Sequence, residues 1–120
     1  RTLRLSPAVL PRAHRLTRAD DFRLAVRRGR RFPTASAVCY RIAAEVDGPL
    51  FGVIVSKQVG NAVVRNRIRR RIQAICAETV RDAAPGQLVV VRALPSSREA
   101  EWDTLRAEIG GAVRRAVMAV

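Results

Sequence analysis

Residues 50–73 read LFGVIVSKQVGNAVVRNRIRRRIQ, an apolar run followed directly by an arginine-rich segment. The unbroken apolar run at 50–55 predicts a strand that is buried on both faces. Gly60-Asn61 breaks this strand, and a long helix is expected from there to about residue 84, where Pro85-Gly86 ends it. The apolar residues of this helix recur at helical spacing, at Val64, Ile68, Ile72 and Ile75.

Strands are expected on both sides of this helix. The apolar run at 88–91 follows it, so strand, helix and strand form a βαβ unit. Upstream, residues 35–42 have β-type composition, and Val38, Tyr40 and Ile42 share one face of the strand. Asp47-Gly48 signals the turn that follows. Residues 30–32 could add a short extra strand.

Two further helices are expected near the ends of the chain. Thr17 and Asp20 match a capping box, and the helix that they begin ends at Gly29. Ser96 and Glu99 match a second capping box before a helix at about 98–117. The apolar stripes of these two helices are, in order, Phe22, Ala25 and Val26, and Trp102, Leu105, Ile109 and Val113. The element order predicts an α/β (α+β) sandwich of one sheet and its helices.

The chain of 120 residues fits a single domain with its own core. Residues 1–16 carry prolines and arginines without a clear period, and we expect a flexible basic N-terminal arm there, followed by one domain at 17–120. Two prolines interrupt the apolar patch of the arm, so it does not match a signal peptide. No apolar run reaches membrane-spanning length, and we expect a cytoplasmic protein without a membrane partner.

Positive charge is concentrated in the first part of the chain. The formal net charge is +13, and residues 1–71 hold 17 basic and 4 acidic residues, whereas residues 72–120 hold 6 of each. Such a field predicts a polyanionic partner, in particular a nucleic acid. All basic residues except Lys57 are arginine. Arginine suits phosphate, although a GC-rich genome would produce the same bias.

The arginines of the long helix surround its apolar stripe. Five of them fall between positions 65 and 71, and no acidic residue lies between Asn61 and Ala77. On a helical wheel they lie on both sides of the stripe, while Asn66 and Gln73 point almost opposite the core. Because these arginines repel one another unless a polyanion is near, they favour a phosphate-binding surface over a merely solvated face.

The start of this helix is a second candidate phosphate site. Backbone N–H groups and the positive end of the helix dipole meet at Gly60-Asn61, and Lys57 precedes them. Gly60 also makes the strand-to-helix turn, and Asn61 also suits the N-cap position. The two roles are compatible, so both are expected.

The segment SKQVGNAVVRNRIRRRIQ, residues 56–73, resembles the signature of the bacterial ribonuclease P protein family, K-x-x-G-N-A-V-x-R-N-R-x-K/R-R. Arg15-Leu16 and Asp21-Phe22 resemble the family's opening R-L-x-x-x-x-D-F helix, and the similarity extends over nearly the whole chain. The resemblance implies an α-β-β-β-α-β-α fold with a central mixed four-stranded sheet and a left-handed βαβ crossover. That hand is an exception to the usual rule.

The resemblance also implies a function. Family members bind the catalytic RNA subunit of ribonuclease P and assist endonucleolytic removal of the 5′ leader of precursor tRNA. Catalysis would belong to the RNA, and Mg²⁺ would be bound mainly by that RNA, with no cofactor intrinsic to the protein. The implied partners are ribonuclease P RNA and precursor tRNA, without an obligate protein partner.

The family's binding residues carry over onto two sets of positions. The RNA subunit would be contacted by Lys57, Gly60, Asn61, Arg65, Asn66, Arg67, Arg69 and Arg70. The leader would enter a cleft between the first helix and the sheet, lined by Phe22, Val26, Tyr40 and Lys57. Aromatic side chains there would stack on bases without sequence preference.

Three departures from the family pattern concern this cleft. Val26 stands where the family often has a second aromatic residue, Gln58 where a second lysine is common, and Ala37 where a strand aromatic is found. We therefore expect an intact RNA-subunit surface and shallow discrimination between leader-bearing and mature tRNA.

Two other functions stay open on the residues alone. A self-sufficient nuclease would need a general base or a metal cluster. His14 is the only histidine and lies in the expected arm, and Asp20 and Asp21 are adjacent, so they point to different sides of a helix. A ribosomal-type RNA-binding module or a DNA-reading helix with Asn66 at base edges is the second alternative. Cys39 and Cys76 show no metal or redox spacing, and we expect buried free thiols.

Overall fold

The computed structural model describes residues 9–119, and the order of its main elements is α-β-β-β-α-β-α, as expected. The helices and strands are α1 (Ala19–Arg28), β1 (Arg30–Pro33), β2 (Ala37–Ala43), β3 (Pro49–Ile54), α2 (Ala62–Ala77), β4 (Gln87–Ala93) and α3 (Trp102–Met118). Three short 3-10 helices join them, η1 (Arg12–His14), η2 (Val80–Asp82) and η3 (Pro95–Glu99).

The four strands form one mixed sheet in the order β1-β2-β4-β3. β2 pairs antiparallel with β1 and with β4, whereas β3 and β4 pair in parallel and are joined through α2. The predicted βαβ unit and the extra strand β1 are thus confirmed. The turn at Asp47-Gly48 joins β2 to β3, but these strands do not form a hairpin because β4 lies between them. The left-handed crossover stays a prediction.

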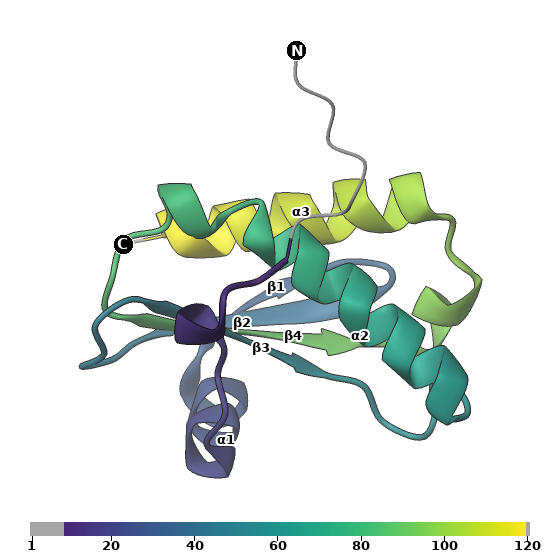
Figure 1. The fold of residues 1–120 in the computed structure, drawn as a ribbon, viewed down its shortest axis with the longest axis horizontal. Helices are drawn as coiled ribbons and strands as arrows, with labels where there is room; N and C mark the ends of the chain where they lie inside the picture. The colour runs from purple at the N-terminus through teal and green to yellow at the C-terminus, as the bar shows by residue number, and fades with distance from the viewer. Residues whose placement is uncertain (1–8, 120) are drawn as a thin grey trace.

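The helices cover the two faces of the sheet unequally (Figure 1). α2 and α3 lie over one face, and α1 lies against the other, which we call the α1 face. Each face has its own apolar cluster. In β2, Cys39 contributes to the α2/α3 cluster, whereas Val38 and Tyr40 contribute to the α1 cluster, as the period of two requires.

The apolar stripes of α2 and α3 are confirmed except at their first residues, Val64 and Trp102, which are only partly buried. Ile68, Ile72 and Ile75 of α2 are fully buried, and so are the predicted core residues of α3 other than Trp102. Trp102 is only half-buried because it lies at the first residue of α3. Burial of such stripes supplies most of the stability of a helix in a folded domain.

β3 is less buried than its apolar composition predicts. Within residues 9–119 it is an edge strand, since β4 is the one named strand that pairs with it. Leu50, Val53 and Ile54 are half-buried, while Phe51 is fully buried between the sheet and α2. The expectation that β3 is buried on both faces is therefore wrong, since Leu50 and Ile54 are only partly buried against the α1 cluster and Val53 only partly buried against the α2/α3 cluster.

Residues 9–16 belong to the folded domain and do not form a flexible arm. Leu10 and Leu16 are buried, at 2% and 6% exposure. The Leu16 N–H donates to the Phe51 carbonyl at 2.8 Å, and Arg15 forms a parallel bridge with the same residue. The expected arm is thus wrong for these residues, and its first eight positions lie outside the described part of the chain.

Three helix ends differ from the expected positions. α1 begins after Arg18, and Thr17 does not cap it. α2 ends at Ala77 rather than near residue 84, because the hydroxyl and the N–H of Thr79 both donate to the Cys76 carbonyl and turn the chain into η2. α3 begins at Trp102, since the Ser96 hydroxyl donates instead to the Ala35 carbonyl at 2.8 Å.

Candidate nucleic-acid interface

The arginines of α2 divide into two flanks around its buried stripe. Arg65 and Arg69 lie on one flank, and the other flank carries Arg67, Arg70 and Arg71. Arg67 and Arg70 are exposed, and the other three are half-buried. As no acidic residue lies in α2, the helix presents positive charge along both flanks.

Hydrogen bonds hold the first flank in place. The guanidinium of Arg65 donates through Nη1 to the Gly60 carbonyl at 2.8 Å. Arg69 donates through Nη1 to Oδ1 of Asn66, also at 2.8 Å. Each of these guanidinium groups has further donors, so both can still bind phosphate oxygens. A side chain that is already oriented loses less rotamer freedom when it binds.

The second flank is not neutralised within the domain. Within residues 9–119, Arg67, Arg70 and Arg71 form no ion pair. The guanidinium carbon of Arg71 lies 5.8 Å from the centroid of the Trp102 ring, in a cation–π contact. The positive charge on this side of α2 therefore faces solvent and is available to an anionic partner.

The start of α2 has the predicted cap. Oδ1 of Asn61 accepts the Val64 N–H at 3.0 Å, which leaves other first-turn N–H groups to water or to a ligand. A Cβ at Gly60 would lie 2.9 Å from Cγ1 of Val64, so glycine is needed for this close approach. Lys57 is exposed in the turn before α2. Phosphate binding at this helix start stays a prediction.

The α1 face brings together three of the four residues expected in the leader cleft. Phe22, Val26 and Tyr40 belong to one apolar cluster between α1 and the sheet. The Phe22 ring lies against Gly52 of β3, and both Phe22 and Val26 are half-buried. Tyr40 is only 4% exposed, with the Arg31 guanidinium 5.9 Å from its ring centroid. Phe22 is thus the more accessible ring.

The other positions related to the cleft lie in different places. Lys57 and Gln58 are both exposed in the turn after β3. Ala37 belongs to the cluster under α2 and α3, so relating it to the cleft is wrong. The reason is the strand period, which places odd-numbered residues of β2 on the face opposite Tyr40.

Two arginines on the α1 face were missed from the sequence. Arg31 pairs with Tyr40 across β1 and β2. Arg92 of β4 pairs with Val38 of β2 on one side and with Ile54 of β3 on the other. Cross-strand partners share a face, and both arginines are exposed. Arg92 follows an unbroken apolar run at 88–91, so no alternation indicated its face, and only the strand pairing identifies its neighbours.

The residues that a protein nuclease would need are otherwise engaged. Nδ1–H of His14 donates to the Pro49 carbonyl at 2.9 Å, so this histidine is half-buried in the domain and not solvated in an arm. Asp20 pairs with Arg23 on the surface of α1. In the described part of the chain, no three His, Cys, Asp or Glu residues gather as metal ligands would.

Both cysteines are free and buried, as predicted. Burial raises the pKa of the Cys39 thiol to about 12 and also raises the pKa of Cys76. Both thiols are therefore protonated and unreactive at neutral pH. None of the helices between residues 9 and 119 has the length and hydropathy needed to span a membrane.

Comparisons with known proteins agree with this architecture. A family model described as Ribonuclease P matches residues 10–117. The ribonuclease P protein component of Clavibacter michiganensis is 45% identical over 113 residues, which are 93% of this chain and 100% of that protein. That of Mycolicibacterium vanbaalenii is 40% identical over 110 residues, 89% and 92% of the two chains. A solved Staphylococcus aureus RNase P protein mutant with defective mRNA degradation activity has a TM-score of 0.79 at 23% identity, over 87% of this chain and 88% of its own.

Proposed function

The chain belongs to the ribonuclease P protein family, and on that premise we propose that it is the RNA-binding protein subunit of a bacterial ribonuclease P. In this role it binds the catalytic RNA and the 5′ leader of precursor tRNA. It assists the endonucleolytic removal of the leader, which produces the mature tRNA 5′ end.

The observation that carries this proposal is the arginine surface of α2. Five arginines lie on two flanks of one helix without an acid among them, and all of them except Arg71 occupy positions of the family signature. Arg65, Asn66, Arg67, Arg69 and Arg70 bind the RNA subunit in this proposal. Lys57, Gly60 and Asn61 lie at the edge of that surface, where the helix start favours a phosphate.

The α1 face supports the second part of the proposal, the binding of the leader. Phe22 offers a partly exposed ring on which a base can stack. Val26 borders it, while Tyr40 supports the surface from below and holds Arg31 against its ring. Arg31, Arg92 and Lys57 are exposed cations for the leader phosphates. Because this face is opposite α2 and α3, one protein can bind both RNAs at once.

The chemistry belongs to the RNA subunit in this proposal. Mg²⁺ is held mainly by that RNA in this proposal, and we assign no step to a protein-bound metal and no catalytic residue to this chain. The protein acts in the cytoplasm, with ribonuclease P RNA and precursor tRNA as its partners and without an obligate protein partner.

The test is cleavage of precursor tRNA at low Mg²⁺, with a cognate ribonuclease P RNA, in the presence and absence of the protein. We expect cleavage at the mature 5′ end only when both are present. Cleavage by the protein alone would favour a nuclease instead. If a folded protein gives no rescue with a cognate RNA, the proposed function is wrong and a different RNA-binding role remains.

A further inference from the structure

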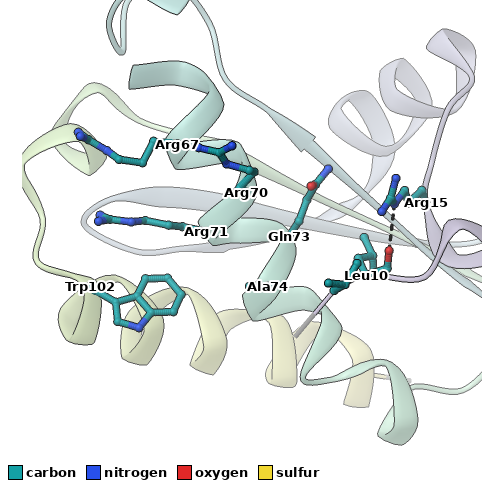
Figure 2. Close-up of a pocket in the computed structure, with 9 residues that line it drawn as sticks. Leu10, Arg15, Arg67, Arg70, Arg71, Gln73, Ala74 and Trp102 are labelled. Atoms are coloured by element: carbon teal, nitrogen blue, oxygen red, sulfur yellow. Dashed lines mark hydrogen bonds between the residues drawn. The ribbon is translucent and has the colours of Figure 1, made fainter. Parts of the chain in front are cut away.

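A pocket of about 610 Å³ adjoins the arginine surface of α2, between α2, the first described residues and the start of α3. Figure 2 shows Arg71 and Trp102 at one end and Leu10 and Arg15 at the other, with α2 between them. The volume falls in the range of about 300–1,000 Å³ that is usual for small-ligand sites. The residues of the family signature do not by themselves define this pocket, because segments far apart in sequence form it.

The floor of the pocket is apolar and fixed. Leu10 and Ala74 are buried, at 2% and 7% exposure, and they line it together with the half-buried ring of Trp102. Nε of Arg15 donates to the Leu10 carbonyl at 3.0 Å and holds this segment against the domain. A flat apolar group can therefore replace water on the floor with a gain from burial.

The rim of the pocket is cationic. Arg67, Arg70 and Arg71 line it from α2, and no acidic residue is among the described residues that line it. Gln73 adds an amide that can donate or accept a hydrogen bond. An apolar floor with an indole ring, below three guanidinium groups, fits a ligand that has a flat aromatic part and negative charge. A nucleotide has both.

We propose that this pocket binds one unpaired nucleotide of ribonuclease P RNA, with its base against Trp102 and its phosphates at Arg67 and Arg70. This inference rests on the proposed function. A base exposes its face only where it is unpaired and unstacked, so the occupant comes from a bulge or loop and not from a duplex. Arg71 holds the indole from one side and lines the rim of the pocket beside the base.

The RNA subunit is the source because of where the pocket lies. It is on the α2/α3 side of the sheet, and it shares Arg67 and Arg70 with the proposed RNA-subunit surface. The proposed leader surface is on the opposite side, beneath α1. The RNA subunit bound to α2 can therefore reach the pocket directly.

The test uses Trp102 as its own reporter, since it is the only tryptophan of the chain. Ribonuclease P RNA is titrated into the full-length protein while tryptophan fluorescence and RNA binding are followed separately. Stacking of a base on the indole should quench its fluorescence in parallel with binding. A short leader oligonucleotide, in a second titration, should leave the fluorescence unchanged. Quenching by the leader and not by the RNA subunit would overturn the assignment.

Two variants separate stacking from folding. We expect Trp102→Ala to weaken binding of the RNA subunit about tenfold, within the range for loss of one base–aromatic stack, and Trp102→Phe to weaken it less because a flat ring remains. Met118→Ala removes another exposed apolar side chain of α3, far along the helix, and should leave RNA affinity unchanged. Thermal unfolding shows whether each variant is folded at the assay temperature.

The outcomes distinguish this inference from the proposed function. If wild-type protein binds the RNA tightly without quenching, and both Trp102 variants bind as well as wild type, the pocket has no nucleotide and the proposed function stands. If wild-type protein does not bind the RNA at all, the proposed function itself fails.

Discussion

Substitution of Gly52 by alanine tests how the α1 face is built. A Cβ at this position of β3 would lie 2.6 Å from Cζ of Phe22 and 3.0 Å from Cδ2 of Leu16. Carbon atoms in contact prefer about 3.5–4.0 Å, so the Phe22 ring has to withdraw by about 1 Å. The half-buried ring lies between α1 and the sheet, and this movement disturbs the apolar cluster that both share.

The size of the effect follows from this overlap. Overpacking of a core position costs typically about 1–3 kcal/mol, and we expect about 2 kcal/mol for Gly52→Ala. With an unfolding entropy of about 2.1 cal/mol/K per residue, that loss lowers the Tm of the 120-residue chain by about 8 °C. Thermal unfolding followed by circular dichroism measures the shift.

Gly110→Ala is the matched control. The nearest atoms to a Cβ at Gly110 are Nη1 of Arg114 and Cγ2 of Ile75, both at 3.7 Å, which is ordinary contact. This glycine lies inside α3, where alanine is favoured by about 0.5–1 kcal/mol. The same chemical change should therefore stabilise the protein at position 110 and destabilise it at position 52.

A double variant identifies the cause. In a Phe22→Ala background the ring is absent and only the close contact with Leu16 remains, so Gly52→Ala should cost clearly less than in the wild-type protein, and the two substitutions should be non-additive. The reasoning is refuted if Gly52→Ala leaves the Tm unchanged, or if it costs the same with and without the ring. Because α2 lies on the opposite side of the sheet, affinity for the RNA subunit should be unaffected.

Four further results are expected. The holoenzyme should bind leader-bearing precursor and mature tRNA with comparable affinity, and a strong preference for the precursor in equilibrium binding would contradict shallow discrimination. Replacing Arg67 and Arg69 together by alanine should reduce the slope of log affinity for the RNA against log salt by about 1.5, whereas the exposed Arg98→Ala should not change it. Asn61→Ala removes the cap of α2 and should cost about 1 kcal/mol in thermal unfolding, while Asn61→Asp should keep most of it. Burial raises the pKa of Cys39 from 9.0 to about 12, so this thiol contributes stability that is complete below pH 9 and lost as the pH rises toward 12. The Tm should therefore fall between pH 9 and pH 12, and it should fall less steeply for the Cys39→Ala variant than for the wild-type protein. Equal slopes for the two proteins would show that ionisation of Cys39 does not cause the loss of stability.

Much of the fold was predictable because local patterns agree with it. The period of α2 identified Ile68, Ile72 and Ile75 as its core, and the period of β2 put Val38 and Tyr40 on one face. Helix ends were less predictable, since side chains from other segments compete for the same groups. Ser96 matched a capping pattern, but its hydroxyl bonds the backbone of a residue 61 positions away.

The arginine surface of α2 was easier to predict from the sequence than the α1 face. The α2 arginines and the Asn61 cap lie within one continuous segment, where the motif and the helical period place them. The α1 face depends on strand pairing, and Arg31 and Arg92 come next to Tyr40 and Ile54 only through the register of the sheet. The burial of Tyr40 also depends on α1, which strand alternation alone does not position.

By itself, the amino-acid sequence determined the βαβ unit, the excess of positive charge and the arginine helix, because each depends on residues that are close in the chain. Only the tertiary structure decided which strand lies at the edge, how residues 9–16 pack, and that Leu10, α2 and Trp102 enclose one pocket. The physical reason is that local periodicity sets which side of an element is apolar, while the free energy of burying all these sides together selects their partners.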